Sequence, residues 1–184
     1  VVTSLGEGVK GFVLAQVESF GSNLIQVEVK IPNTTAMSSD NSTGRAQGTQ
    51  ITTLTVKDGE AIAKLPNVAA VYAGTIGQER ATYGSVGKRI SLFGTGADVA
   101  EVDANLKLES GRFFTAEEDD SLAQVAVLGS DTKDTFFGES EAVGEYITLK
   151  GDKYRVIGVL APRGAVAFLN FDTFTYIPVQ TLQK

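Results

Sequence analysis

The sequence contains no cysteine and no histidine. A thiol nucleophile, a Ser-His-Asp triad, a zinc cluster and a metal site built on histidine therefore have no residues to form from within this chain. Lack of cysteine is typical of bacterial proteins outside the cytoplasm, where free thiols are a liability, but it also occurs in many cytosolic proteins. Together the two absences exclude more chemistry than any motif in the sequence supports.

Long apolar runs and an excess of positive charge are missing as well. No stretch approaches the roughly 18 uninterrupted apolar residues of a membrane span, and no basic-then-apolar signal segment opens the sequence. We therefore expect either a soluble protein or a soluble piece of a larger one.

The 184 residues include 16 basic and 22 acidic side chains, giving a net charge of −6. Nucleic acid and anionic membrane surfaces are accordingly not expected as partners.

Residues 4–11 read SLGEGVKG, in which Gly6, Gly8 and Gly11 have the spacing of a dinucleotide-binding loop. Such a loop works only between a buried strand and a helix, with an acidic residue about twenty positions later. The motif lies too near the first residue to leave room for that strand. We therefore interpret these glycines as part of an amphipathic helix over residues 4–20 and expect no cofactor there.

Apolar periodicity and turn residues predict helices and strands in irregular order. The predicted helices cover residues 4–20, 55–65, part of 98–108, and 130–137. The predicted strands cover residues 23–30, 68–76, 89–93, 125–129, 145–150, 153–160 and 175–179, with a Gly-rich turn at 83–87 and a two-residue Gly151-Asp152 hairpin turn. Residues 32–53 have scarcely an apolar side chain and predict a long polar loop. Because helices and strands do not alternate regularly, the predicted class is α+β rather than a doubly wound sheet.

Glu117-Glu118-Asp119-Asp120 is the only concentration of carboxylates in the sequence. Hard cations favour carboxylate oxygens, but this segment lacks the alternating Asp/Asn spacing of a calcium-binding loop. Thr115 followed by Glu118 fits a capping box, and acidic side chains in a first turn interact favourably with the helix dipole. The segment therefore predicts the start of a helix, and we expect no metal site.

Residues 164–171 read GAVAFLNF, an apolar stretch where a turn is expected. A buried strand leading to the C-terminal strand would explain it, and so would an exposed apolar loop that contacts a partner protein or the membrane surface. In the second case Phe168, Leu169 and Phe171 are the candidate partner contacts. No local pattern picks out a nucleophile or a base, so we predict no catalytic residue; an enzyme using only Asp, Glu, Ser or Lys remains an open alternative.

Nine short stretches gain meaning from their order along nearly the whole chain. They are Gly6-Glu7-Gly8, Gly21-Ser22-Asn23-Leu24-Ile25, residues 61–68 (AIAKLPNV), Gly111-Arg112-Phe113-Phe114, Val125-Ala126-Val127-Leu128-Gly129, Phe136-Phe137-Gly138, Val143-Gly144, Val156-Ile157-Gly158-Val159-Leu160, and Asp172 before Ile177-Pro178-Val179. Each is weak alone. In this order they resemble the MacB-type periplasmic core domain of ABC transporter permeases, the family that includes macrolide exporters, lipoprotein-release permeases and the cell-division permease FtsX.

The resemblance implies a two-lobed α+β domain on the extracytoplasmic side of the cell membrane. An outer, porter-like α+β lobe would comprise residues 1–96 and 161–184, and a smaller, sabre-like α/β lobe would be inserted at residues 97–160. A first membrane helix would lead directly into residues 4–8, and a second membrane helix would begin soon after Lys184. Gly6 and Gly8 would then be hinge candidates, where small residues permit a bend or close helix packing.

The same resemblance implies partners rather than catalysis in this domain. An ABC ATPase, in the same chain or a separate one, would hydrolyse ATP, and the permease would form a homodimer through its membrane part. An adaptor protein is a further expected partner, as in Gram-negative exporters of the family, from which the loop at 32–53 and the apolar segment at 165–171 depart. The alternative is a free-standing secreted binding module of the same fold with no transport role. Hydrophobic spans flanking this chain in the full gene would distinguish the two.

Overall fold

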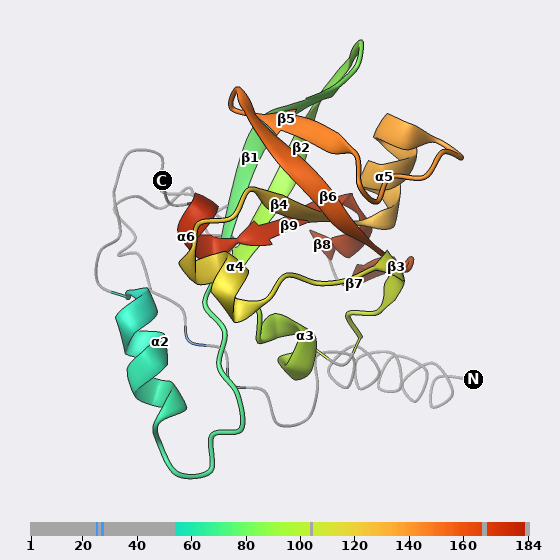
Figure 1. Ribbon diagram of the computed structural model, residues 1–184. Helices are drawn as coiled ribbons and strands as arrows, with labels where there is room; N and C mark the ends of the chain where they lie inside the picture. The colour runs from blue at the N-terminus through green and yellow to red at the C-terminus, as the bar shows by residue number, and fades with distance from the viewer. Residues whose placement is uncertain (1–24, 26, 28–53, 104, 167–168, 183–184) are drawn as a thin grey trace, which may run out of the picture.

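The computed structural model describes residues 25, 27, 54–103, 105–166 and 169–182 (Figure 1). The predicted helix at 4–20 and the polar loop at 32–53 lie outside the described residues. Of the predicted strand at 23–30, only Ile25 and Val27 are described, and neither lies in a strand. Within the described part of the chain, no helix is long and apolar enough to cross a membrane.

Short helices surround a set of strands in the described chain. The helices are α2 (Val56–Ala63), α3 (Val99–Val102), α4 (Ala116–Asp120), α5 (Ser130–Phe137), the 3-10 helix η2 (Phe171–Thr173) and α6 (Val179–Leu182). The strands are β1 (Gly74–Tyr83), β2 (Val86–Thr95), β3 (Leu108–Gly111), β4 (Val125–Leu128), β5 (Tyr146–Leu149), β6 (Asp152–Leu160), β7 (Ala165–Val166), β8 (Leu169–Asn170) and β9 (Phe174–Pro178). The mixture confirms the α+β class.

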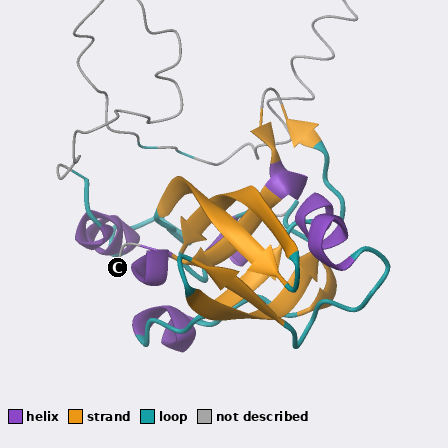
Figure 2. Ribbon diagram, turned by 90° about the horizontal axis from the view of Figure 1, so that it is seen from above, coloured by secondary structure: helices purple, strands orange, loops and turns teal. Residues whose placement is uncertain are grey.

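Seven strands form one mixed sheet in the order β3-β6-β4-β9-β2-β1-β5, and β5 also pairs with β6. β5 and β3 lie one after the other along the same edge of β6: β5 pairs with Asp152 to Arg155, and β3 pairs with Gly158 to Leu160. The β5–β6 pairing closes six strands into a barrel, which Figure 2 shows from above. Closure satisfies strand edges that an open sheet would leave exposed.

The barrel interior is an apolar core to which all six barrel strands contribute. Its fully or nearly fully buried members include Ala81, Leu92, Leu128, Ile147, Val156 and Ile177. Phe136 and Phe137 from α5 belong to the same cluster, and the ring centroids of Phe137 and Tyr83 lie 4.2 Å apart. Every barrel strand therefore has a buried face, which fixes its register, since a one-residue slip would turn that face outward.

A second apolar cluster covers the outer face of β4, β6 and β9. Its buried members are Phe114, Val125, Val127, Ile157, Leu160, Phe174 and Tyr176, with Phe93, Phe113 and Phe171 partly buried against them. Of the two adjacent aromatic residues that follow Arg112, Phe114 is buried and Phe113 is half-buried. β4, β6 and β9 thus contribute buried residues to both clusters.

Most local predictions are confirmed, with shifts at two turns. The predicted Gly151-Asp152 turn is wrong by one residue: Leu149 pairs with Asp152, and Lys150 and Gly151 both have positive φ, as a two-residue hairpin turn requires. The predicted strand at 68–76 is also wrong, because β1 begins at Gly74 and runs to Tyr83. Tyr83 pairs with Val86, so the strands continue into the predicted turn at 83–87 and leave only Gly84-Ser85 between them.

Strands from both predicted lobes lie in the same barrel. β1, β2 and β9 come from the stretches assigned to the outer lobe, whereas β4, β5 and β6 come from residues 97–160. The pairings β4–β9 and β1–β5 join the two sets. The division into an outer lobe at residues 1–96 plus 161–184 and an inserted lobe at residues 97–160 stays a prediction.

Candidate functional site

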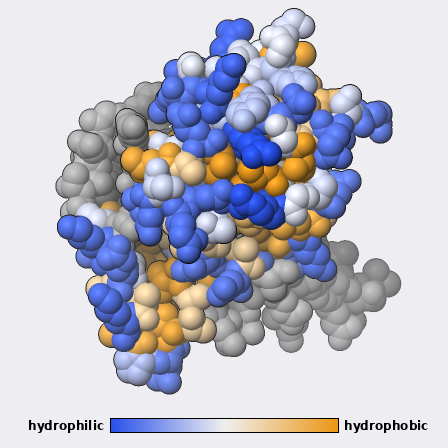
Figure 3. Space-filling view, in the orientation of Figure 1, coloured by the Kyte–Doolittle hydropathy of each residue, from blue (hydrophilic) through white to orange (hydrophobic). Residues whose placement is uncertain are grey.

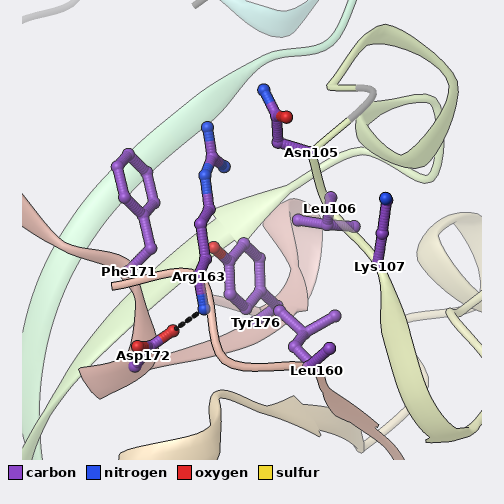
Figure 4. A pocket seen from close by; sticks show the side chains of 9 residues that line it. Asn105, Leu106, Lys107, Leu160, Arg163, Phe171, Asp172 and Tyr176 are labelled. Carbon is purple, nitrogen blue, oxygen red and sulfur yellow. Dashed lines mark hydrogen bonds between the residues drawn. The ribbon is translucent and has the colours of Figure 1, made fainter. Parts of the chain in front are cut away.

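A cluster of half-buried polar side chains lies where the chain leaves β6 and enters the β7–β8 hairpin (Figure 4). Its anchor is Asp172, which is 8% exposed. The Asp172 carboxylate accepts the backbone N–H of Arg163 at 2.8 Å and that of Gly164 at 2.7 Å. Gly164 has a φ of +80°, a backbone conformation that residues other than glycine rarely adopt. Asp172 therefore fixes this turn by satisfying two adjacent backbone donors.

The side chain of Arg163 extends the cluster to the segment after α3. Its guanidinium donates to Asp103 at 2.6 Å, and both side chains are less than a quarter exposed. The same guanidinium lies 4.3 Å from the centre of the Phe171 ring, a cation–π contact. We term Asp103, Arg163, Phe171 and Asp172 the Arg163 cluster.

Two tyrosines beside the cluster have raised pKa values. Burial is the larger cause for Tyr72, and the negative charge of Asp103 adds to it. Burial is also the main cause of the raised pKa of Tyr176, which is 2% exposed. Both side chains therefore remain neutral at physiological pH.

A small depression opens beside the cluster, lined by Leu106, Lys107, Leu160, Arg163 and Tyr176 among others (Figure 4). The cavity volume is about 10 Å³, which is at the lower limit for a single water molecule. The chemistry of the cluster is thus that of a structural clamp at the base of a hairpin.

The predicted site residues divide between described and undescribed parts of the chain. Gly6, Gly8 and Phe168 lie outside the described residues. The backbone of Leu169 lies in β8, opposite Val166. Phe171 is half-buried, packed against the outer cluster and beneath Arg163. In place of the single buried strand considered for residues 164–171, the structure has the two short antiparallel strands β7 and β8.

The acidic segment at 117–120 begins a helix, as predicted. Thr115 and Glu118 form both hydrogen bonds of a capping box at the start of α4. Arg112 donates to both oxygens of Glu118, each at 2.7 Å, and this interaction lowers the pKa of Glu118. Among the described residues, no group of three or more His, Cys, Asp or Glu side chains could hold a metal ion.

The end of α4 fastens the C-terminal helix α6 to the barrel domain. Asp119 accepts the backbone N–H of Gln180 at 3.3 Å, and Asp120 accepts the side-chain amide of Gln180 at 3.1 Å. The Thr181 hydroxyl donates to the carbonyl of Ala123 at 3.2 Å. Burial raises the pKa of Asp119. Helix α6 is therefore held by side chains about sixty residues earlier in the sequence.

Sequence reasoning missed both sets of long-range contacts. Asp103 and Arg163 are 60 positions apart, and neither stands in a pattern that marks it. Asp172 was noted only as part of a family motif, whereas its role as acceptor for two backbone N–H groups depends on the turn at Arg163 and Gly164. No local sequence pattern identifies Asp172 as the acceptor for this turn or Arg163 as the partner of Asp103.

The sequence matches the family described as MacB-like periplasmic core domain over residues 1–184. The chain is 32% identical over 167 residues to the macrolide export ATP-binding/permease protein MacB of Wolinella succinogenes, covering 91% of this chain and 24% of that protein. It is also 32% identical over 169 residues to the pyoverdine export ATP-binding/permease protein PvdT of Pseudomonas aeruginosa, covering 90% of this chain and 23% of that protein.

A solved structure agrees with these sequence relatives. The crystal structure of the periplasmic region of MacB from Actinobacillus actinomycetemcomitans superimposes with a TM-score of 0.63 and 25% identity, covering 72% of this chain and 58% of that one. The chain spans about a quarter of the length of the curated relatives it matches. The match over all 184 residues shows that this chain belongs to the MacB-like periplasmic core domain family.

Proposed function

We propose that this chain is the extracytoplasmic domain of an ABC export permease of the MacB/FtsX type and that it transmits ATP-driven conformational change. The observation that supports this most is the family match over the whole chain, together with relatives named as ATP-binding/permease proteins of which the chain corresponds to about a quarter. The rest of such a protein leaves room for membrane spans and an ATPase. The free-standing secreted module is not favoured by these relatives.

The barrel suits the transmission of movement. Six strands from distant parts of the sequence close on one core, and a second apolar cluster covers the outer face of β4, β6 and β9. Packed interiors of this kind have low compressibility and transmit strain. Because α4 also fastens α6, a movement applied at the C-terminal end would move the barrel as a body.

The partners in this proposal lie in the membrane and beyond it. An ABC ATPase, fused or separate, supplies the energy, and two permease copies associate through their membrane parts. The domain itself is non-catalytic. Gly6 and Gly8 are the proposed hinge, and Phe168, Leu169 and Phe171 are the proposed contacts for an adaptor protein. In the full permease, replacing Gly6 and Gly8 with alanine should alter transport without changing ATP binding.

The exported compound stays open in this proposal. Two relatives with the same 32% identity are named for export of different compounds, macrolides and pyoverdine. Identity at this level therefore supports export as the class of function and gives no preference for a substrate.

Labelling from outside the cell tests the proposed position. The chain has no cysteine, so Glu139→Cys, at an exposed site after α5, places a single thiol in the domain of the full-length protein. A membrane-impermeant maleimide should label this thiol in spheroplasts as fully as in lysed cells. Labelling only after lysis, or a full gene without hydrophobic spans on either side of this chain, would overturn the proposal.

A further inference from the structure

Strand β1 is fully paired along one edge and only partly paired along the other. On one side β2 pairs with all ten residues, from Gly74 to Tyr83. On the other side β5 pairs with Ala81 and Thr82 alone. Within the described ranges, residues 74–80 therefore form an open strand edge. Such edges present unpaired backbone groups that can take up another strand.

Alternate residues supply the backbone groups of this edge. In an antiparallel pair, one residue bonds to the partner strand and the next points its N–H and C=O groups away from it. The two-residue turn at Gly84-Ser85 makes Tyr83 and Val86 a hydrogen-bonded pair, so every second residue before Tyr83 bonds to β2. The remaining residues, whose groups point to the open edge, are Gly74, Ile76, Gln78 and Arg80.

The open edge is protected only at its Arg80 end. Natural edges are blocked by charged side chains, proline or bulges. The Arg80 N–H already donates to the Glu79 carboxylate at 3.1 Å. Residues 74–78 read GTIGQ, with no charge and no proline, and they pair with β2 without a bulge. The accessible part of the edge is therefore centred on Ile76.

The Ile76 side chain extends the outer apolar cluster to this edge. Ile76 is 46% exposed and lies directly opposite Phe93, whose ring centroid is 5.5 Å from that of Tyr176. On the face shown in Figure 3, apolar side chains gather in separate patches between hydrophilic ones, so exposure alone does not mark a docking surface. Ile76 is distinguished by the unpaired backbone groups beside it, and an added strand would cover both.

A second copy of this chain fits the edge through its own sequence. In an antiparallel pairing centred on Ile76, each Ile76 faces its counterpart and Gly74 faces the partner's Gln78, which gives about six backbone hydrogen bonds. The same edge then serves both copies, as two-fold symmetry requires.

Charge does not oppose this pairing. The nearest charged residues on the strand are Glu79 and Arg80, and the same register places them opposite the partner's Ala73 and Tyr72. Like charges directly opposite each other would be destabilising, and none arises here.

The size of the contact suits copies that are already held together. An edge of five residues buries far less surface than the roughly 1,200–2,000 Å² of a stable protein interface. Two free domains should therefore not associate through it alone, whereas tethering makes the contact intramolecular and removes the need for such an area. This step rests on the proposed function, in which two permease copies associate through their membrane parts.

We infer that the open edge of β1 pairs with the same edge of a second copy of this chain within a permease dimer. The two extracytoplasmic domains then meet at Ile76, through backbone hydrogen bonds and one apolar contact. Because so few residues take part, the pairing can break and re-form as the domains move.

Disulfide cross-linking in the full-length permease tests the pairing and its register. The chain contains no cysteine, so Ile76→Cys as the only cysteine of the permease places one thiol at the centre of each edge. Directly opposed Cα atoms of a hydrogen-bonded pair lie about 5.5 Å apart, within the range of roughly 4.4–6.8 Å that a disulfide spans. The matched control, Gln78→Cys, is exposed on the same edge, but its two copies would lie roughly 14 Å apart.

Mild oxidation of membranes containing each variant should give at least about tenfold more cross-linked dimer from Ile76→Cys than from Gln78→Cys. The comparison is made without nucleotide and with ATP and vanadate, and the difference is expected in at least one of these states. Equal cross-linking of the two variants in both states would indicate random collision, and no cross-linking of Ile76→Cys in either state would show that the edges do not meet. Either result would overturn the inference. ATP hydrolysis by each reduced variant reports its folding.

Hydrogen exchange of this 184-residue chain tests the other occupant of the edge, a segment of the same copy. The amides of Ile76 and Gln78 should exchange much faster than those of Gly77 and Glu79, which bond to β2. Equally slow exchange of all four in a monomer would show that the chain covers its own edge, and the inference would be wrong. The proposed function fails by a different measurement, the labelling of Glu139→Cys, so the two failures are distinguishable.

Discussion

Asp172 provides the sharpest test of how the chain stabilises the base of the β7–β8 hairpin. Replacing it with alanine leaves the backbone N–H groups of Arg163 and Gly164 without their acceptor in a site where the carboxylate is 8% exposed. A buried donor left unsatisfied costs about 1–3 kcal/mol. For two donors we expect the free energy of unfolding to fall by about 2 to 6 kcal/mol, a large part of the total for a domain of this size.

Urea unfolding followed by far-UV circular dichroism measures this loss, since the chain has no tryptophan to report by fluorescence. Asp172→Asn keeps one acceptor oxygen and should lose about half as much as Asp172→Ala. The control is Asp134→Ala, because the Asp134 side chain is 70% exposed and pairs only with Lys133 at 3.4 Å; it should change stability by less than about 0.5 kcal/mol. If Asp172→Ala is no more destabilising than this control, the clamp does not stabilise the fold.

Three further variants test other parts of the account. Arg80 and Arg89 lie directly opposite each other on β1 and β2, so Arg89→Glu replaces a facing pair of like charges with an opposite-charge pair and should raise stability by about 0.2–1 kcal/mol in the same assay; a loss of stability would contradict this pairing. Gly129→Ala would place a methyl group against the backbone of Asp172 and Phe174, so it should cost about 1–3 kcal/mol, and an unchanged melting temperature would refute that contact. Arg112 lowers the pKa of Glu118 below its ordinary value of 4.5. The Arg112–Glu118 interaction therefore contributes to stability above pH 4.5, and this contribution is lost as the pH falls through the lowered pKa. Glu118→Gln should therefore be less stable than the wild type near pH 7 and should match it in acid, whereas a pH-independent difference would rule out the ion pair as its cause.

Local elements with start and stop signals were predictable from the sequence. Helix α5 matches its prediction at 130–137, since Gly129 precedes it and Gly138, with φ +56°, ends it. The capping box at Thr115 and Glu118 likewise follows from the identity of two residues. These features depend on contacts within a few residues, which periodicity and capping patterns describe.

Closure of the barrel was not predictable in the same way. It depends on pairings such as Ala81 with Leu149 and Leu128 with Thr175, which join distant positions. β-Propensity alone gives no partner for a strand, because pairing is decided by the packing of all faces together. The same limit explains why Arg163 and Asp103 were missed and why β1 was placed too early in the sequence.

The net charge of −6 gives no indication that two arginines face each other at the surface. Arg80 and Arg89 come together only when β1 and β2 pair in this register. Their acidic counterparts lie elsewhere, for example on α4. A net value describes solubility and long-range attraction, whereas recognition depends on where each charge lies.

The central claim, that this domain moves with the ATP cycle of a permease, is tested most directly by a distance between two copies. The measurement is double electron–electron resonance on the full-length permease in lipid nanodiscs, spin-labelled at Glu139→Cys as its only cysteine, nucleotide-free and trapped with ATP and vanadate. We predict that the distance distribution between the two labels shifts between the two states and that a hydrolysis-deficient ATPase variant with ATP reproduces the trapped distribution. Identical distributions in an enzyme that hydrolyses ATP would contradict the account.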